Sequence, residues 1–177
     1  RWQIADIVGG HRARTHPLSP ARRRRIVDRV VRLGYKGVGD GFRAAAQTVF
    51  DFVRSIIEEQ AIPEDVTISV LTQAREELIE RTVQSLVGSS RATTHLYNAT
   101  APLFRRVVFR GSRDDVRSIA VDGTRLLMEY ARKILGSDTV LGYEYSPGIF
   151  TDTEREFALD VWRVGVDVWW AGEGRDA

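Results

Sequence analysis

The chain contains no cysteine, which excludes disulfides, thiolate nucleophiles and cysteine-ligated metal sites. It is also poor in lysine: only Lys36 and Lys133 occur among the 26 basic residues, and we attribute this arginine bias to the source genome rather than to a ligand. No uninterrupted apolar run approaches the roughly 18 residues of a membrane span, and no charged-then-apolar signal segment opens the chain. These absences predict a cytoplasmic protein that does not contact a membrane.

The length and composition indicate one folded domain over residues 1–177. With 43% hydrophobic residues the chain can bury a sizeable core, but it is too short for a complete eight-fold βα barrel, which needs about 250 residues. The formal charge of +2 is close to neutral. Four successive arginines, 22–25, would spread around a helix axis, and no aromatic residues alternate with them, so we expect a solvated surface and no nucleic-acid partner.

Short β-branched runs alternate with longer amphipathic stretches along the chain. The short runs predict strands at residues 2–8, 36–40, 66–71, 93–97 and 140–145, with VGVDVWWAG at 164–172 as a sixth. Apolar residues at helical spacing follow the first five runs; Ser19 and Ser112 are the expected N-caps of two helices, and the fifth helix is expected at 151–163. This alternation predicts an α/β fold with parallel strands, and ligands at their C-terminal ends. The element order alone allows either a doubly wound sheet or part of a barrel.

Three motifs in one register resemble a known family. They are RLGYKGVGDGFRAAAQTVFDFVRSIIEEQAIPEDVTISVLTQAREELIERT, then THLYNATAPLFRRVVFR, then GYEYSPGIFTDTEREFA. They resemble the catalytic domain of α-isopropylmalate synthase of the actinobacterial type, within the DRE-TIM metallolyase-like family. Its members are dimeric (β/α)₈ barrels that condense acetyl-CoA with an α-keto acid by means of a divalent metal. The resemblance implies a truncated and degenerate domain: a partial TIM-type barrel of about five to six parallel βα units, completed or covered by dimerisation.

Several residues that carry the family's chemistry are replaced. The family's first strand ends in Asp-Leu-Arg-Asp-Gly-Asn-Gln, whose arginine polarises the keto acid and whose second aspartate binds the metal; this chain has Val8 and Gly9 there. The second-strand glutamate is lost or displaced to Asp40, and Ser-Pro-Glu on the fifth strand ends here in Gly148. The family's His-x-His metal ligands lie beyond this chain. We therefore expect no metal, no other cofactor and no acetyl-CoA condensation.

Part of the organic pocket is retained, since the resemblance places His95, Thr100 and Glu144 around the keto acid. A lone buried carboxylate at Glu144 would have a raised pKa, which suits an acid–base group, and pairing with Arg75 is the alternative. His95 is equally compatible with a merely structural hydrogen bond. We assign catalytic roles to Glu144, His95 and Tyr97. The expected substrate-binding residues are Asn98, Thr100, Gln73, Arg75, Tyr145, Thr151, His11 and Arg12.

Two functions follow from this pattern. The first is a metal-independent enzyme of specialised-metabolite (natural-product) biosynthesis that cyclises, dehydrates, isomerises or hydrolyses a small-molecule substrate. The second is a non-catalytic pseudoenzyme or partner subunit. A partial barrel also exposes its edge strands, and Trp162, Trp169 and Trp170 near the end of the chain are natural interface anchors. We expect a homodimer, with a separate chain supplying the rest of the barrel as the alternative.

Overall fold

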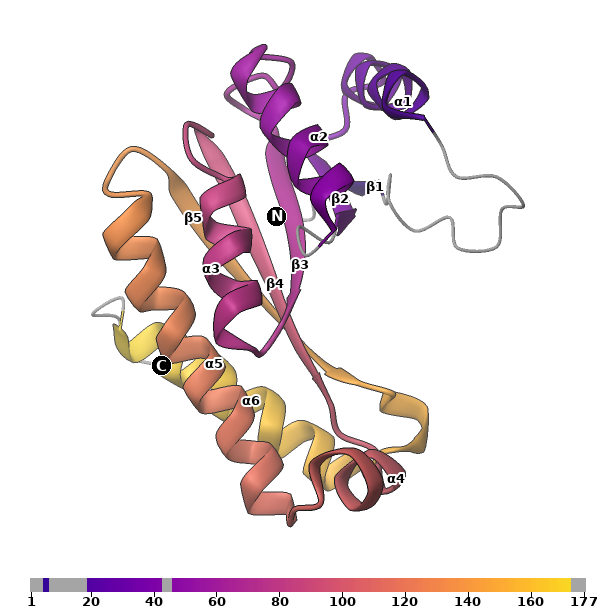
Figure 1. Ribbon diagram of the computed structural model, residues 1–177, viewed down its shortest axis with the longest axis vertical. Helices are drawn as coiled ribbons and strands as arrows, with labels where there is room; N and C mark the ends of the chain where they lie inside the picture. The colour runs from indigo at the N-terminus through magenta and orange to yellow at the C-terminus, as the bar shows by residue number, and fades with distance from the viewer. Residues whose placement is uncertain (1–4, 7–18, 43–45, 173–177) are drawn as a thin grey trace.

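The computed structural model describes residues 5–6, 19–42 and 46–172 (Figure 1). The strands are β1 (Ala5–Asp6), β2 (Gly37–Phe42), β3 (Thr67–Gln73), β4 (Arg91–Ala99) and β5 (Val140–Gly148). The main helices are α1 (Pro20–Arg32), α2 (Gln47–Glu58), α3 (Glu76–Ser85), α5 (Arg113–Ile134) and α6 (Arg155–Gly172). Shorter turns are α4 (Pro102–Phe104), the π-helical η1 (Arg105–Phe109) and the 3₁₀ helix η2 (Phe150–Asp152). Within these ranges no helix has the length and apolar character needed to cross a bilayer.

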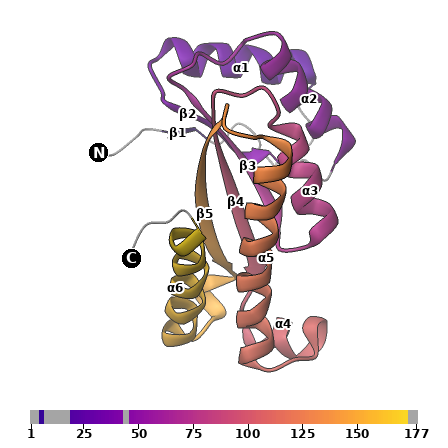
Figure 2. The same cartoon turned by 90° about the vertical axis from the view of Figure 1, so that its left-hand side faces the viewer.

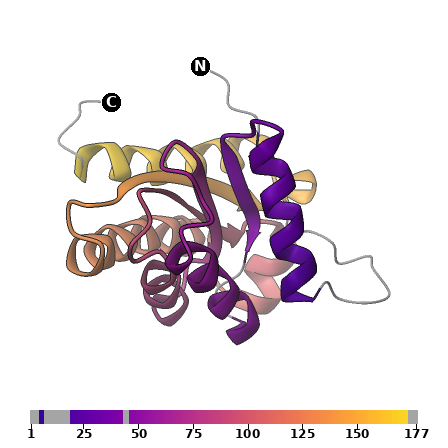
Figure 3. The same ribbon diagram turned by 90° about the horizontal axis from the view of Figure 1, so that it is seen from above.

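The five strands are parallel and lie in the same order in the sheet as in the sequence, β1-β2-β3-β4-β5. Because parallel crossovers have one hand, a sequential order places every connecting helix on the same side of the sheet. Seen from above, the helices follow one another around the outside of the strands, from α1 to α6 (Figure 3). A doubly wound sheet would reverse its order and carry helices on both faces. The chain is therefore a partial (β/α) barrel of five units.

The core lies between the sheet and this outer helical layer. Ile68 and Val70 of β3 and Leu96 of β4 are fully buried there, together with Leu127 of α5. Helix α5 approaches the sheet closely because Gly123 has no side chain: a Cβ there would lie 2.8 Å from the Cβ of Ala74. Helices α5 and α6 pack side by side over β4 and β5 (Figure 2). The strands therefore have one face packed under helices and one face without helical cover.

The two predicted helix starts are confirmed. Ser19 is the N-cap of α1, and its hydroxyl accepts a hydrogen bond from the backbone N–H of Arg22 at 3.4 Å. Ser112 is the N-cap of α5 and forms a reciprocal capping box with Asp115. Each cap satisfies donors that the first turn of a helix otherwise leaves unpaired.

The predicted sixth strand at 164–172 is wrong, and the fifth helix is longer than expected. Residues 155–172 form one helix, α6, whose buried residues Phe157, Val161, Gly165 and Trp169 recur every four positions. The Trp169 ring stacks on Tyr143 of β5 with centroids 4.9 Å apart. The valines at 164, 166 and 168 alternate as in a strand, but the four-residue spacing is the one that buries apolar surface on β5.

Candidate functional site

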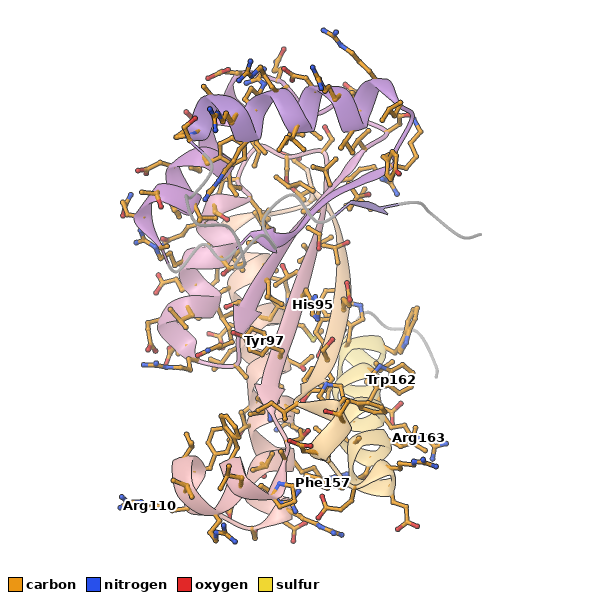
Figure 4. The ribbon with its side chains drawn as sticks, turned by 90° about the vertical axis from the view of Figure 1, so that its right-hand side faces the viewer. His95, Tyr97, Arg110, Phe157, Trp162 and Arg163 are labelled. Atoms are coloured by element: carbon orange, nitrogen blue, oxygen red, sulfur yellow. The ribbon has the colours of Figure 1, made fainter. Side chains whose placement is uncertain are left out.

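The face of the sheet opposite the helices carries the candidate site (Figure 4). Side chains alternate along a strand, so His95 and Tyr97 lie on one face of β4 while Leu96, which packs toward α5, lies on the other. The register places His95 opposite Glu144 and Tyr97 opposite Ser146. Two polar residues from each strand therefore meet on the same open face.

His95 lies between a hydroxyl and a carboxylate. Its Nε2 is 2.7 Å from the Oγ of Ser146, and its Nδ1 is 3.5 Å from Oε1 of Glu144. The imidazole is 11% exposed, so its orientation is constrained by its surroundings. A neutral imidazole has one donor and one acceptor nitrogen, and a carboxylate at Nδ1 favours the tautomer whose Nε2 accepts the proton of Ser146.

Both predictions for Glu144, burial as a lone carboxylate and pairing with Arg75, are wrong. Its side chain is 49% exposed rather than buried, and its partner on β4 is His95 rather than Arg75. Arg75 instead pairs with Glu77 at the start of α3. Since β5 is the last strand of the described sheet, a side chain on its open face remains accessible to solvent. Glu144 is therefore placed to orient His95.

Tyr97 and Gln73 are also brought to this face. The Nε2 of Gln73, the last residue of β3, donates to the Tyr97 hydroxyl at 3.1 Å. Thr151 lies apart from them in η2, where it is exposed. His11 and Arg12 lie outside the described residues, as do Val8 and Gly9.

Three other predicted substrate ligands lie away from the face of His95. The Tyr145 hydroxyl donates to Oδ1 of Asn98 at 2.5 Å, and both side chains are buried on the helix-facing side of the sheet. Burial raises the pKa of Tyr145, which keeps its phenol neutral. Thr100 is fully buried after β4, where its hydroxyl contacts Thr153 at 2.8 Å. These three side chains bond to the protein framework and do not reach the face that carries His95.

A groove of 860 Å³ runs along the free side of β5, between α5 and α6. Trp162 and Trp170, exposed by 43% and 37%, line it together with Val166 and Leu135. Glu144 of the candidate site also lines this groove. Of the three tryptophans expected at an interface, Trp169 is instead buried against Tyr143, although its edge also reaches the groove.

Comparison with known proteins agrees with this architecture. A model of the HMGL-like family matches residues 5–168, nearly the whole chain. The chain belongs to the HMGL-like family. It is 55% identical to the 2-isopropylmalate synthase of Thermobifida fusca over 99% of this chain and 31% of that protein. It is 53% identical to the 2-isopropylmalate synthase of Streptosporangium roseum and 47% identical to that of Cupriavidus taiwanensis. Each of these two matches covers 99% of this chain and 30% of the relative.

These relatives confirm the resemblance to isopropylmalate synthases. The chain spans about a third of the length of the curated relatives it matches. The activity in their names is that of proteins about three times as long as this HMGL-like chain.

The described residues do not fit the divalent metal implied by the family resemblance. Among them, no three histidine or carboxylate side chains lie together. The site contributes one imidazole and one carboxylate, which already contact each other, whereas zinc takes three or four protein ligands and calcium six to eight oxygens. That the protein works without one stays a prediction.

Two features of this HMGL-like chain were not assigned from the sequence. The first is Ser146, which follows Glu144 by two residues in β5. Because side chains alternate along a strand, the sequence alone could have placed both residues on one face. The second is an ion pair between Arg105 and Glu154, made by two hydrogen bonds of 2.8 and 2.6 Å. Nothing in the local sequence distinguishes Arg105 from the neighbouring Arg106.

Proposed function

We propose that this chain provides the proton-transferring part of a metal-independent enzyme that acts on a small organic molecule in specialised-metabolite biosynthesis. The observation that carries the proposal is the position of His95, with Ser146 at Nε2 and Glu144 at Nδ1, on the open face of the sheet. Histidine is the side chain most often used to move protons near neutral pH, and a carboxylate at its other nitrogen orients it.

The proposed chemistry uses only groups on this face. In the proposed step the substrate takes the place of the Ser146 hydroxyl at Nε2 of His95. His95 then accepts a proton from the substrate there and returns it at another atom, which suffices for a cyclisation, dehydration, isomerisation or hydrolysis. Tyr97 and Gln73, joined by a hydrogen bond of 3.1 Å, are placed to bind a polar group of the substrate. Glu144 acts as a positioning residue, because it reaches the reacting atoms only through His95.

The test compares extracts of small molecules before and after incubation with the protein in a chelating buffer. We expect at least one compound to be consumed by the wild type. His95→Gln should slow consumption by about 10² to 10⁴-fold, the usual contribution of one acid–base group, and Glu144→Gln should slow it less. Ser118→Ala, an exposed change on α5, is the matched control and should be unchanged.

Three outcomes contradict this proposal: a metabolite profile that the wild type leaves unchanged, consumption that survives in His95→Gln, and turnover that requires a divalent cation. Condensation of acetyl-CoA with 2-oxoisovalerate by the wild type would likewise show that the parent reaction persists and that the proposed function is wrong.

A partner-binding role is the second candidate, and the groove along β5 favours it. In the described sheet β5 pairs only with β4, so its other edge presents backbone groups beside apolar walls that include Trp162 and Trp170. We propose a second copy of this chain as the occupant, because two copies related by a two-fold axis would place one β5 edge against the other and cover both grooves.

Light scattering across a wide range of protein concentration tests this dimer. The wild type should have the mass of a dimer, and Trp162→Glu should have that of a monomer. Leu33→Glu introduces the same charge at a 76%-exposed site at the end of α1 and should stay dimeric. A wild type that is monomeric at every concentration, or a Trp162→Glu variant that still dimerises, would overturn the proposal.

A further inference from the structure

We infer that Ser146 is a nucleophile, and that Glu144, His95 and Ser146 form an acyl-transfer array that takes small esters or thioesters. The inference rests on the proposed function, since it uses the same histidine as the proton acceptor. It adds a covalent step and a substrate class, neither of which follows from acid–base chemistry alone.

The distances match the requirements for activating a hydroxyl nucleophile. A serine hydroxyl is weak until a base accepts its proton, and the two must lie within about 2.6 to 3.2 Å. The Oγ of Ser146 and the Nε2 of His95 are 2.7 Å apart. A third group then orients the base from its opposite nitrogen, and here that group is Glu144 at 3.5 Å. Such contacts are often longer without substrate and shorten when it binds.

The strand pairing explains why these three residues meet. Glu144 lies directly opposite His95 in the register, and Ser146 is two residues farther along the same face of β5. The imidazole therefore bridges two side chains of one neighbouring strand. The array needs only the β4–β5 pair, which is the region of the sheet with the longest continuous register.

Access and polarity at Ser146 suit an acyl substrate. Ser146 is partly exposed on the open face, and we place the carbonyl carbon of the substrate at its Oγ. Tyr97 stands opposite Ser146 in the register, and its hydroxyl oxygen accepts a hydrogen bond from Gln73. Gln73, Tyr97 and Ser146 are register partners on three neighbouring strands. We therefore assign the polar hydrogens of Tyr97 and Gln73 to the carbonyl oxygen of the substrate, where negative charge develops.

The covalent step balances with the substrate and water alone. The Oγ of Ser146 forms a bond to the carbonyl carbon, and its proton passes to Nε2 of His95. The bond from the carbonyl carbon to the leaving oxygen or sulfur breaks, and His95 returns the proton to the departing alcohol or thiol. Water then adds to the acyl-serine by the same route, which releases the acid and restores Ser146. No electron is gained or lost.

Covalent labelling with diisopropyl fluorophosphate tests the array without knowledge of the natural substrate. We expect one adduct per chain on the peptide that contains Ser146, detected by mass spectrometry. Ser146→Ala should remove this adduct, and His95→Gln should slow its formation by about 10² to 10⁴-fold. Ser118→Ala should be labelled like the wild type. Absence of the adduct on the folded wild type, or equal labelling rates in His95→Gln, would overturn the inference.

Hydrolysis of p-nitrophenyl acetate separates this inference from the proposed function. We expect a burst of one p-nitrophenol per chain, lost in Ser146→Ala and reduced in Tyr97→Phe. Thermal unfolding checks that each variant is folded. If Ser146→Ala consumes the metabolite found with the wild type at the wild-type rate, while His95→Gln does not, the assignment of Ser146 as nucleophile is wrong and the acid–base proposal stands. If His95→Gln consumes that metabolite as fast as the wild type, the acid–base proposal is wrong.

Discussion

Arg105 and Glu154 join the end of β4 to the start of α6. The guanidinium, 11% exposed, also donates to the carbonyl oxygen of Thr100 at 2.7 Å and lies 4.9 Å from the ring centroid of Phe157. Arg113 adds a second cation to the same carboxylate at 2.9 Å. The hydrogen bonds from Arg105, with smaller contributions from the backbone and Arg113, lower the pKa of Glu154 from its ordinary 4.5 to about 2.

This pair predicts a specific loss of stability in acid. A carboxyl whose pKa is lower in the folded state stabilises the fold above its unfolded pKa, and the stabilisation disappears as the pH falls from about 4.5 to about 2. Glu154→Gln should therefore be less stable than the wild type at pH 7, with the difference shrinking in acid. Urea unfolding at several pH values measures this.

Glu64→Gln changes a carboxylate of the same type at an exposed site, away from the Arg105 pair, and should follow the wild type at every pH. A difference between Glu154→Gln and the wild type that stays constant from pH 7 to pH 3 would contradict the assigned role of the ion pair.

For single residues, the sequence predicts which face of a strand a side chain lies on better than it predicts which residue of the neighbouring strand that side chain contacts. Strand periodicity places His95 and Tyr97 together and separates them from Asn98, which could have been foreseen. It does not determine which residue of β5 lies opposite His95, because that depends on a register between strands joined by the long helix α5. Exposure of Glu144 depends on its strand being at the edge of the described sheet, a property that no local pattern contains.

Helix α5 illustrates what short-range chemistry determines at the level of the element. Its N-terminal Ser112 accepts a hydrogen bond from the N–H of Asp115 at 3.2 Å, and the Asp115 carboxylate accepts one from the N–H of Ser112 at 2.6 Å. The bonds from Ser112 lower the pKa of Asp115, so the carboxylate stays charged at the positive end of the helix. Two residues three positions apart, Ser112 and Asp115, are enough to define where this helix begins.

Removing the cap should weaken the fold by a modest amount. Ser112→Ala leaves the first-turn N–H groups without the serine oxygen, and a lost N-cap costs about 1 kcal/mol. Ser118→Ala makes the same chemical change at an exposed position within α5 and should be neutral or slightly stabilising, since alanine favours helices. Chemical denaturation of both variants gives the comparison. Equal stabilities would show that the capping box contributes nothing.

Helices and strands were predicted well where the hydrophobic pattern and the length of the segment indicate the same element. In α6 the two signals disagree. The β-branched runs located β3 and β5 to within a few residues at each end. In α6 the alternating valines end the expected helix at Arg163, although the four-residue spacing of Phe157, Val161 and Trp169 continues through it. Trp169 covers a surface of β5, so packing against the sheet, rather than the local sequence pattern, determines that these residues are helical.

At the scale of the whole molecule, the sequential strand order creates two different faces. Helices cover the outer face, and the inner face, which carries His95, has no helical cover in the described structure (Figure 4). Alternating strands and helices predicted parallel pairing but allowed two topologies, and the observed order decides between them. The order depends on which strands meet in space, so it could be anticipated only from the family resemblance.

Trp169 provides the final prediction, because it connects the last helix to the sheet. Its side chain is 8% exposed and stacks on Tyr143, whose hydroxyl contacts Thr124 of α5 at 2.7 Å. Trp169 of α6 therefore packs on Tyr143 of β5, which in turn contacts α5. Trp169→Ala should lower the free energy of unfolding by about 3 to 5 kcal/mol, the usual cost of emptying a large core site.

Leu159→Ala is the matched control, since this leucine lies on the same helix but is 46% exposed and should change stability by no more than about 0.5 kcal/mol. Urea unfolding at one fixed protein concentration measures both variants, and the change in near-ultraviolet circular dichroism between the wild type and Trp169→Ala reports the loss of the stacked pair. If residues 164–172 paired as a strand, the loss of unfolding free energy on substitution by alanine would alternate from one residue to the next. Equal and small effects at Trp169 and Leu159 would mean that α6 does not cover β5 as described.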